Sequence, residues 1–481
     1  MSYGSSAIQL PLFAPPQRRG TTLSSQNVPM QNLGKFTARP YQFEAIKHLL
    51  ARPFGGLLMD PGTGKTASTL AAFTLLKKKK LVDRMLVIAP LRPAYEVWPA
   101  EVAKWDFPLS IVVAHGSRRV EVLDEGTDII VTNYDSIVWI FELMKQKLKS
   151  ERWWLVLDES TKVKHTNTMR FRGLRPWLPV FHRRTILTGT PSPNGLMDLF
   201  GQVFAVDLGA TLGKYITQYR RDFFYATGYG GYTWVLQPGA EEKIHARLAG
   251  MFYRVSDDVL DLPPCHSVPL YVRLKPKAQK VYDQLKDDFV AELRDGLVTA
   301  VNAGVKTMKL RQVANGTLYG DLHVRHEIHD EKIEAITDLV EQLQGNPLLV
   351  GYEFTADGER LSRALDGAPI IGGETKPKDA NVLFAAFNRG EIPVLICQSG
   401  STAHGLNLQE ACHTIALFGL TWNLETYQQF IKRVHRGGQK KTVIVHHVLA
   451  RGTIDDVIWS VLRSKAKKQN SLLTAITQEY L

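Results

Sequence analysis

Short runs of apolar residues recur along the chain from Lys35 onward, and longer segments with a helical repeat of apolar positions separate them. Met85–Ile88, Asp128–Val131 and Trp154–Leu157 are nearly continuous in apolar side chains. Such runs are typical of strands that are covered on both faces. Their alternation with helical segments predicts a parallel sheet with helices on both sides.

The same alternation starts again in the second half of the chain. Its strand candidates are Pro347–Val350, Ile392–Ile396, Thr414–Leu417 and Val443–Val445. Before them, Gln279–Arg294 carries apolar residues four positions apart, which predicts an amphipathic helix. The predicted fold class is therefore α/β, with two lobes that each contain a mostly parallel sheet flanked by helices, and with small helical insertions.

The composition narrows the class of protein. The chain has 481 residues, of which 44% are hydrophobic and 22% charged, which excludes collagen-like, coiled-coil and wholly disordered proteins. Cys265, Cys397 and Cys412 are too far apart for a disulfide framework or a Cys-x-x-Cys zinc site, which fits a reducing cytosol. No apolar run reaches the ~18 residues of a membrane span, and the N-terminus lacks a signal-peptide pattern. We therefore expect a cytoplasmic protein, in a bacterial cell or a phage-infected host.

Basic residues outnumber acidic ones, 59 against 47, and the formal net charge is +12. The excess lies at the two ends: residues 1–100 carry 13 basic and 4 acidic side chains, and residues 401–481 carry 10 and 5. Residues 251–400, in contrast, carry 17 and 22. Because a basic surface attracts polyanions, nucleic acid is the leading candidate partner. A general solubility charge is the alternative interpretation.

The segment Gly55–Thr66 contains the strongest chemical signal. It follows a short apolar stretch, ends in Gly-Thr-Gly-Lys-Thr and precedes a helical pattern. Glycines allow backbone N–H groups to approach phosphates, Lys65 would reach the β- and γ-phosphates, and Thr66 would hold Mg²⁺. Met59 stands where the strict pattern has glycine. The strand, loop and helix context nevertheless favours a nucleotide site over a chance glycine-rich turn.

Two carboxylates, Asp158 and Glu159, directly follow the apolar run Trp154–Leu157. A site that hydrolyses a nucleotide needs an acid for Mg²⁺ and a group that orients water. Asp158 would hold the metal through water, and Glu159 would activate the attacking water. A carboxylate pair after a strand is usually a solvated turn, but its combination with the phosphate loop favours the catalytic interpretation.

From Lys35 to about Ile458 the chain resembles the superfamily 2 helicase-type ATPases, and within them the SWI/SNF-type DNA translocases. The resemblance implies two RecA-like lobes that share one ATP cleft. Ala38–Gln42 is similar to the adenine-reading Q motif, and Val87–Leu91 is similar to motif Ia, with Trp98 after it. The implied nucleotide-binding residues are Gln42, Pro61, Gly62, Thr63, Gly64, Lys65, Thr66, Asp158, Gly405, Arg433 and Arg436.

Three further segments carry the resemblance and its departures. Asp158–Lys164 is similar to motif II, but Thr161 replaces the usual histidine, which leaves the coupling role of that histidine open. Leu187–Asn194 resembles motif III, which links the ATP site to DNA. Ser401–Leu408 resembles motif V, and Leu424 stands where the family has a proline after Trp-Asn.

Gln428–Gln439 closely matches motif VI, and its ending Arg-Gly-Gly-Gln indicates the SWI/SNF type. On this resemblance Arg433 and Arg436 are arginine fingers. Reasoning from the residues agrees, because two arginines three positions apart share a helix face and can stabilise the charge that develops on a γ-phosphate. A basic solvated helix is the alternative interpretation.

Duplex DNA is expected to lie across both lobes, with contacts mainly to phosphates. Its basic track would follow the tail, the start of the first lobe and motifs V and VI. For Trp422 a place in the core is the alternative. The candidate DNA contacts by motif position are Arg92, Thr132, Asn133, Thr402 and Trp422.

We divide the chain into a flexible tail (1–34), lobe 1 (35–255, with a small insertion at 196–255) and lobe 2 (256–481, with a helical insertion at about 277–330). The expected function is that of an ATP-dependent double-stranded DNA translocase, with ATP and Mg²⁺ as cofactors, that remodels protein–DNA or branched DNA structures in repair or replication. A strand-separating helicase and a non-catalytic DNA-binding subunit are the alternatives. The complete set of ATP-site residues argues against the latter.

The tail holds a second candidate site. Residues 1–34 contain no acidic residue and are rich in Ser, Gln, Pro and Gly, which is typical of flexible segments. Within them, Gln9, Leu10, Leu12 and Phe13 resemble the short peptides that bind the bacterial replication sliding clamp. A chance pentapeptide is the alternative.

Overall fold

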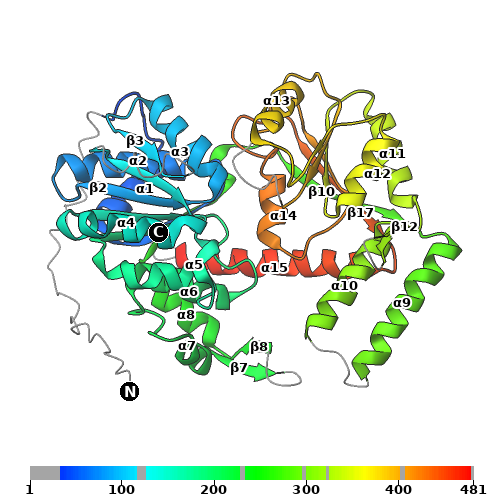
Figure 1. Ribbon diagram of the computed structural model, residues 1–481, viewed down its shortest axis with the longest axis horizontal. Helices are drawn as coiled ribbons and strands as arrows, with labels where there is room; N and C mark the ends of the chain where they lie inside the picture. Colours follow the sequence, from blue (N-terminus) through cyan, green and yellow to red (C-terminus); the bar gives the residue numbers. More distant parts are fainter. Residues whose placement is uncertain are drawn as a thin grey trace, which may run out of the picture.

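The protein is described by a computed structural model that covers residues 33–115, 126–227, 233–294, 300–320, 324–400 and 407–477. Two α/β lobes lie side by side, and the long helix α15 (Ile454–Thr477) runs from lobe 2 back beneath lobe 1 (Figure 1). The clamp-like peptide at residues 9–13 lies outside the described residues, as does nearly all of the predicted tail.

Lobe 1 is built on a seven-stranded sheet in the order β3-β4-β2-β5-β6-β1-β9, in which all neighbouring strands are parallel. Successive residues of the central strands enter opposite core layers: Leu86 and Ile88 join one apolar cluster, and Val87 and Ala89 the other. This double covering is the physical reason for the continuous apolar runs. In sequence order the strands are β1 (Phe54–Met59), β2 (Arg84–Ala89), β3 (Ile111–Val113), β4 (Ile129–Asn133), β5 (Trp153–Asp158), β6 (Arg183–Thr188) and β9 (Phe252–Val255).

Helices cover both faces of this sheet. One core layer is closed by α1, α2 and α3, and the other by α4 to α8. In the second half of the lobe, β7 (Phe224–Thr227) and β8 (Thr233–Leu236) pair antiparallel and project from the lobe (Figure 1). The helices are α1 (Pro40–Ala51), α2 (Lys65–Lys78), α3 (Leu91–Trp105), α4 (Ile137–Ser150), α5 (Met169–Leu174), α6 (Leu199–Asp207), α7 (Ile216–Phe223) and α8 (Ala240–Leu248).

Lobe 2 has a six-stranded sheet in the order β10-β17-β16-β13-β15-β14, again with parallel neighbours. The predicted strands of the second half are all present in it. The strands are β10 (Cys265–Val272), β13 (Leu348–Tyr352), β14 (Ile370–Ile371), β15 (Val394–Gln398), β16 (Thr414–Leu417) and β17 (Val443–Ala450). The helices packed on it are α11 (Glu331–Leu343), α12 (Thr355–Ala364), α13 (Pro377–Asn388), α14 (Leu424–Ile431) and α15.

A pair of long helices, α9 (Pro276–Arg294) and α10 (Ala300–Ala314), projects from lobe 2 (Figure 1). A small apolar cluster that includes Tyr282, Val313 and Ala450 anchors the pair to the end of β17. The amphipathic helix predicted over Gln279–Arg294 is thus confirmed. Between the helices and α11, β11 (Thr317–Tyr319) and β12 (Arg325–Glu327) pair antiparallel.

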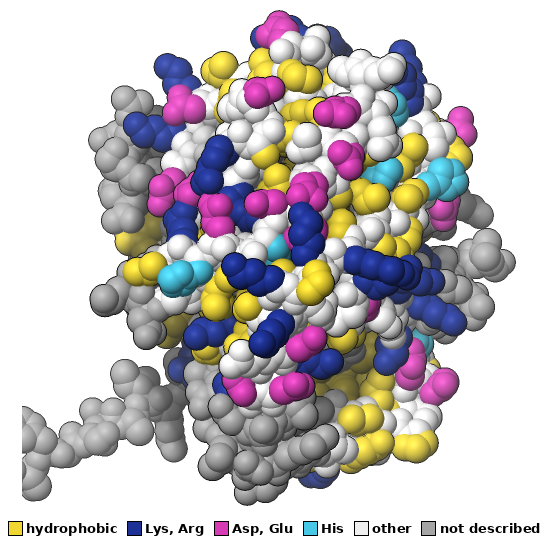
Figure 2. Space-filling view, turned by 90° about the vertical axis from the view of Figure 1, so that its right-hand side faces the viewer, with side chains coloured by type: hydrophobic (Ala, Val, Ile, Leu, Met, Phe, Trp, Pro, Cys, Tyr) yellow, Lys and Arg dark blue, Asp and Glu magenta, His cyan; other side chains and the backbone are white. Residues whose placement is uncertain are grey.

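Helix α15 contacts α8 and β9 of lobe 1 as well as α10, α14 and β17 of lobe 2. The predicted division at residue 255 placed all later residues in lobe 2, and the local pattern gave no sign of this return. In the part of the chain that the structure describes, no helix combines the length and the apolar character that crossing a membrane requires. On the end face of lobe 2, basic and acidic side chains are interspersed (Figure 2).

Candidate active site

The loop between β1 and α2 has the geometry of a phosphate-binding loop. Gly62 and Gly64 have φ angles of 87° and 88°, in the left-handed region that glycine adopts without a steric penalty. A Cβ at Gly64 would lie 2.2 Å from Nε2 of Gln42, so glycine is also required by the close approach of that side chain. Helix α2 begins at Lys65, and a helix N-terminus presents N–H groups to an anion.

Polar side chains fix this loop from several directions. Lys65 Nζ donates to the carbonyl of Met59 at 2.7 Å, and Thr63 Oγ1 donates to the carbonyl of Asp60 at 2.6 Å. Gln42 Nε2 donates to the carbonyl of Thr63 at 3.2 Å, while its Oε1 accepts from the backbone N–H of Arg39 at 3.0 Å. Helix α1 is therefore bound directly to the phosphate loop. The predicted contact of Gln42 with an adenine base stays a prediction.

Asp158 lies at the C-terminal end of β5, in the edge of the sheet where α/β proteins bind their ligands. Its Oδ2 accepts from Trp98 Nε1 at 3.0 Å, and its Oδ1 accepts from the N–H of Glu159 at 3.1 Å. Burial raises the pKa of Asp158 to about 6, and the Glu159 carboxylate adds to that rise, whereas Lys65 and the Trp98 hydrogen bond act against it.

The residues present fit an ATP–Mg²⁺ complex. Mg²⁺ takes oxygen ligands, usually one or two carboxylates together with substrate phosphates. A buried carboxylate whose pKa is raised beside a second carboxylate is a place where a divalent cation relieves repulsion. The described residues contain no group of three or more His, Cys, Asp or Glu suited to a metal of its own. Asp158 and Thr66 would therefore hold the ion together with the nucleotide phosphates.

The loop after Asp158 is held in a strained and well-supported conformation. Glu159 has φ 50° and ψ 58°, which is uncommon for a residue other than glycine and is found at functional sites. Ser160 Oγ donates to Gln202 Oε1 at 2.7 Å, and Gln202 Nε2 donates to the carbonyl of Pro191 at 2.6 Å. Because Pro191 belongs to the motif III segment, the two motif loops are fixed to each other.

Lobe 2 places its motif VI segment against this site. Burial lowers the pKa of Arg433 to about 9, with the neighbouring Arg436 acting in the same direction and the Glu159 carboxylate opposing it. Burial also lowers the pKa of Arg436. A Cβ at Gly62 would lie 3.8 Å from Cβ of Arg436, so the phosphate loop and motif VI are in close contact. The structure thus brings Lys65, Asp158, Glu159, Arg433 and Arg436 together where the two lobes meet.

Two contacts between the lobes were not predicted from the sequence. Lys432 Nζ lies 3.9 Å from Oδ2 of Asp60, and burial lowers the pKa of this lysine. Thr161 Oγ1 donates to Glu425 Oε1 at 2.7 Å. Lys432 directly precedes Arg433 in motif VI, and this position in the sequence could have indicated that Lys432 lies near the phosphate loop. No local pattern marks Thr161 and Glu425 as partners.

The predicted DNA contacts have different surroundings. Arg92 Nη2 donates to Asn381 Oδ1 of lobe 2 at 3.1 Å, and the guanidinium lies 5.5 Å from the Phe384 ring centre. The Thr132 side chain is fully buried, because β4 turns it into the fold, and its Oγ1 donates to the carbonyl of Ala114 at 3.0 Å. Asn133, also buried, accepts from Ser136.

Trp422 is half-buried against the core of lobe 2, and its carbonyl accepts from Lys465 Nζ at 3.0 Å. Thr402 and Gly405, together with most of the motif V segment, lie outside the described residues. DNA binding by all five candidate contacts stays a prediction, as does the nucleotide contact of Gly405.

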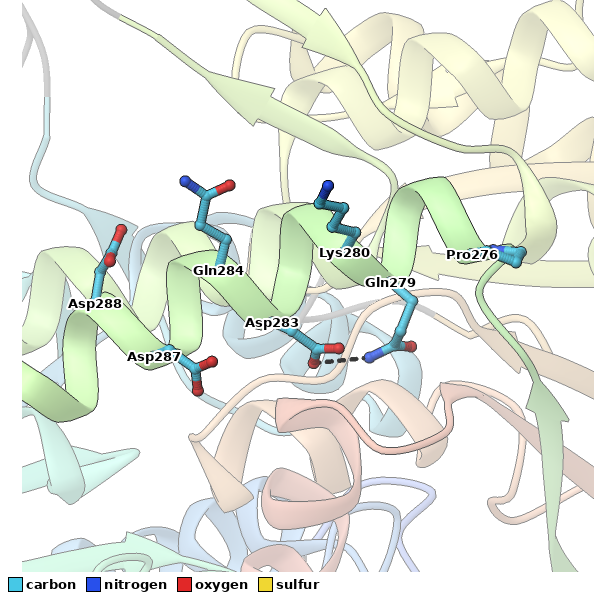
Figure 3. A pocket seen from close by; sticks show the side chains of 7 residues that line it. All are labelled: Pro276, Gln279, Lys280, Asp283, Gln284, Asp287 and Asp288. Atoms are coloured by element: carbon cyan, nitrogen blue, oxygen red, sulfur yellow. Dashed lines mark hydrogen bonds between the residues drawn. The ribbon is translucent and has the colours of Figure 1, made fainter.

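A surface hollow lies on α9 (Figure 3), one of the two helices that project from lobe 2 (Figure 1). Within it, Gln279 Nε2 donates to Asp283 Oδ1 at 2.9 Å (Figure 3). None of its side chains belongs to the site just described. The hollow is lined by Pro276, Gln279, Lys280, Asp283, Gln284, Asp287 and Asp288.

Two parallel-sheet lobes with a phosphate loop, an acidic pair and opposing arginines define a helicase-type ATPase. Residues 41–331 match the SNF2-related domain family, and residues 331–438 match the helicase conserved C-terminal domain family. The chain therefore belongs to the SNF2-related family, and it is an enzyme that hydrolyses ATP with two RecA-like lobes.

Among its relatives, the chain is 33% identical over 471 residues to protein p41 of Acyrthosiphon pisum secondary endosymbiont phage 1, covering 92% of this chain and 99% of p41. It is 25% identical over 465 residues to the uncharacterized ATP-dependent helicase MG018 of Mycoplasma genitalium, covering 92% of this chain and 42% of that protein. This chain therefore spans less than half the length of MG018. The solved SWI2/SNF2 ATPase core of Sulfolobus solfataricus in complex with dsDNA shares 22% identity, with a TM-score of 0.43, over 93% of this chain and 95% of that one.

Proposed function

We propose that this protein is a DNA-dependent ATPase that translocates on double-stranded DNA and remodels protein–DNA or branched DNA structures. The observation that carries the proposal is the division of the ATP site between the lobes. Lys65, Asp158 and Glu159 belong to lobe 1, and Arg433 and Arg436 belong to lobe 2. ATP held by both lobes favours the closed arrangement, and its hydrolysis removes that preference.

In the proposed reaction the chain supplies charge and orientation. Lys65 binds the γ-phosphate, and the two arginines offset the charge that develops on it in the transition state. Glu159 accepts a proton from the attacking water as the water oxygen bonds to the γ-phosphorus and the bridging bond to the β-phosphate breaks. Mg²⁺, when bound, neutralises phosphate charge. Asp158 and Thr66 are the residues that would hold it.

Duplex DNA as the substrate is supported by the family and by the charge distribution. Relatives such as MG018 are named ATP-dependent helicases, and the basic excess lies at the two ends of the chain. A motor that tracks duplex phosphates needs no strand separation, and its affinity falls with rising salt. Action in the cytoplasm, in DNA repair or replication, belongs to the same proposal.

The deciding experiment compares two assays on one preparation of the full chain. Displacement of the third strand of a DNA triplex should require ATP, and unwinding of a plain duplex by the same preparation should not occur. ATPase activity should rise on addition of duplex DNA. Equal stimulation by single strands together with duplex unwinding would instead establish the strand-separating helicase. An absence of any ATP hydrolysis would establish the non-catalytic alternative.

The peptide at residues 9–13 is a separate proposal for a partner. It rests only on the resemblance of Gln9, Leu10, Leu12 and Phe13 to clamp-binding peptides. Purified sliding clamp should retain the full chain in a pull-down and should lose it when residues 9–13 are deleted. Equal retention of both proteins would show that the segment has no such role.

A further inference from the structure

A buried hydrogen bond joins the motif II loop of lobe 1 to helix α14 of lobe 2. Thr161 Oγ1 donates to Glu425 Oε1 at 2.7 Å, and these residues are only 4% and 8% exposed. A hydrogen bond to a carboxylate is stronger than one between neutral groups. Its loss leaves a buried acceptor without that donor, which costs more than the loss of an exposed bond.

The hydrogen bonds continue from Glu425 to an arginine finger. Gln429 Nε2 donates to Glu425 Oε1 at 3.3 Å, and Arg433 Nε donates to the backbone carbonyl of Gln429 at 3.1 Å. Three bonds therefore lead from Thr161 to Arg433, and each acceptor or donor on this path is buried. Arg433 in turn lies near Glu159 of the motif II loop, and their opposite charges attract each other.

The local sequence explains why α14 can carry these groups. Asn423 caps the helix, and its Oδ1 accepts from the N–H groups of Glu425 and Thr426 at 2.9 and 3.3 Å. Glu425 then lies in the first turn, where the helix dipole favours a carboxylate. Gln429 follows four positions later on the same face. The capped helix thus aims one polar face at lobe 1.

On the lobe 1 side, the motif II loop is held rigidly. Ser160 is tied to Gln202, and Lys164 Nζ lies 3.1 Å from Oδ2 of the buried Asp198. Thr161 lies between Ser160 and Lys164 in the sequence, and its hydroxyl points toward Glu425 of lobe 2. The loop that carries Glu159 and the helix that precedes Arg433 are therefore joined by the hydrogen bond between Thr161 and Glu425.

We propose that Thr161 is a positioning residue, whose hydrogen bond to Glu425 places Arg433 opposite Glu159 when the lobes close. The inference rests on the proposed function. It adds how the catalytic groups of lobe 1 and lobe 2 are aligned with each other. When the lobes separate, the bond breaks and Arg433 leaves Glu159. Hydrolysis is thereby confined to the closed arrangement. Thr161 and Glu425 act through other residues and do not touch the nucleotide in this scheme.

The test uses variants of Thr161 in the full chain. Thr161→Val keeps the shape and removes the donor, whereas Thr161→Ser keeps the donor. Thr74→Val is the matched control, because Thr74 is a buried threonine of lobe 1 whose hydroxyl donates within its own helix to Leu70 at 2.9 Å. We expect Thr161→Val to lower kcat about tenfold or more, the factor for one bond to a charged acceptor, with KM for ATP nearly unchanged. Thr161→Ser and Thr74→Val should retain kcat.

A second pair of variants tests the partner. Glu425→Ala should match Thr161→Val, Glu425→Gln should be affected less because its amide oxygen still accepts, and the double variant should be no slower than Glu425→Ala alone. Glu425→Ala also serves if Thr161→Val does not fold. An undiminished kcat in Thr161→Val or Glu425→Ala, or an equal loss in Thr161→Ser, would overturn the inference. Failure of the proposed function is recognised separately, since the wild-type chain would then show no DNA-stimulated hydrolysis, and basal kcat would still compare the variants.

Discussion

The indole Nε1 of Trp98 donates a 3.0 Å hydrogen bond to Oδ2 of Asp158, and both side chains are buried. The bond joins helix α3, which follows the motif Ia segment, to the carboxylate that is proposed to hold Mg²⁺. A hydrogen bond to the ionised form favours that form, so Trp98 opposes the effect of burial on the pKa of Asp158. The tryptophan that marked a motif in the sequence thus has a direct electrostatic role.

Replacing Trp98 by Phe should raise the pKa of Asp158 further above its present value of about 6. Protonated Asp158 cannot hold a cation, so ATP binding with Mg²⁺ should weaken as the pH falls, and more so in the variant. For a rise of about one pKa unit, the ionised fraction of Asp158 at pH 6 falls from about one half to about one eleventh, so the additional loss there should be about fivefold. Titrating a fluorescent ATP analogue between pH 5.5 and pH 8 measures this. Identical pH profiles for the variant and the wild type would contradict it.

Lys65→Ala and Glu159→Gln should both abolish ATP hydrolysis, for different reasons. Lys65 is expected to bind the phosphates, so its loss should also weaken ATP binding. Gln at position 159 keeps the size of the side chain and cannot accept a proton, so Glu159→Gln should still bind ATP. Phosphate release and equilibrium ATP binding, measured on the same samples, separate the two outcomes. Hydrolysis by Glu159→Gln at the wild-type rate would exclude Glu159 as the base.

Arg433→Ala and Arg436→Ala should each lower kcat by about 10³-fold or more, the lower end of the effect of arginine fingers. Their charges act mainly on the transition state, so ATP binding should change far less than kcat. Arg463→Ala on α15 is the control, because that arginine is exposed and its guanidinium lies over Trp459, away from the phosphate loop. A loss in ATP affinity as large as the loss in kcat would assign the arginines to substrate binding instead.

The protein should lose stability in mild acid. His447 is fully buried, and burial lowers its pKa from the usual 6.5 to about 4. Because the unfolded chain binds the proton more readily, this contribution is present above pH 6.5 and is lost as the pH falls toward 4, by about 3 kcal/mol at most. Burial gives His48 of lobe 1 the same shift, to about 4.

The contribution of His447 can be isolated with His447→Gln, which keeps a polar group for the hydroxyl of Tyr427, 2.9 Å from Nε2 of His447. The free energy of unfolding in urea should fall less between pH 7 and pH 4.5 in this variant than in the wild type. His266→Gln, at an exposed site, should behave like the wild type. An unchanged pH dependence in His447→Gln would show that His447 is not responsible.

Local pattern determined much of the fold. Each predicted strand is present in one of the two sheets because a strand covered on both faces must be apolar at consecutive positions, and that signal lies within four or five residues. The phosphate loop could also be predicted from the sequence, since Gly62, Gly64 and Lys65 lie close together, in the short loop before α2 and at the first residue of that helix. Asp158 and Glu159 were found because Asp158 ends such a strand and Glu159 follows it directly.

Contacts between distant segments were decided only by the tertiary structure. The sequence showed that Thr161 departs from motif II, but its partner Glu425 lies 264 positions away, and no periodicity connects the two. The same holds for the return of α15 to lobe 1, and for Arg92, a predicted DNA contact whose guanidinium bonds to Asn381. The chemistry of a side chain follows from the sequence. Its partner in the other lobe depends on how the two lobes pack against each other, and local sequence patterns do not determine that packing.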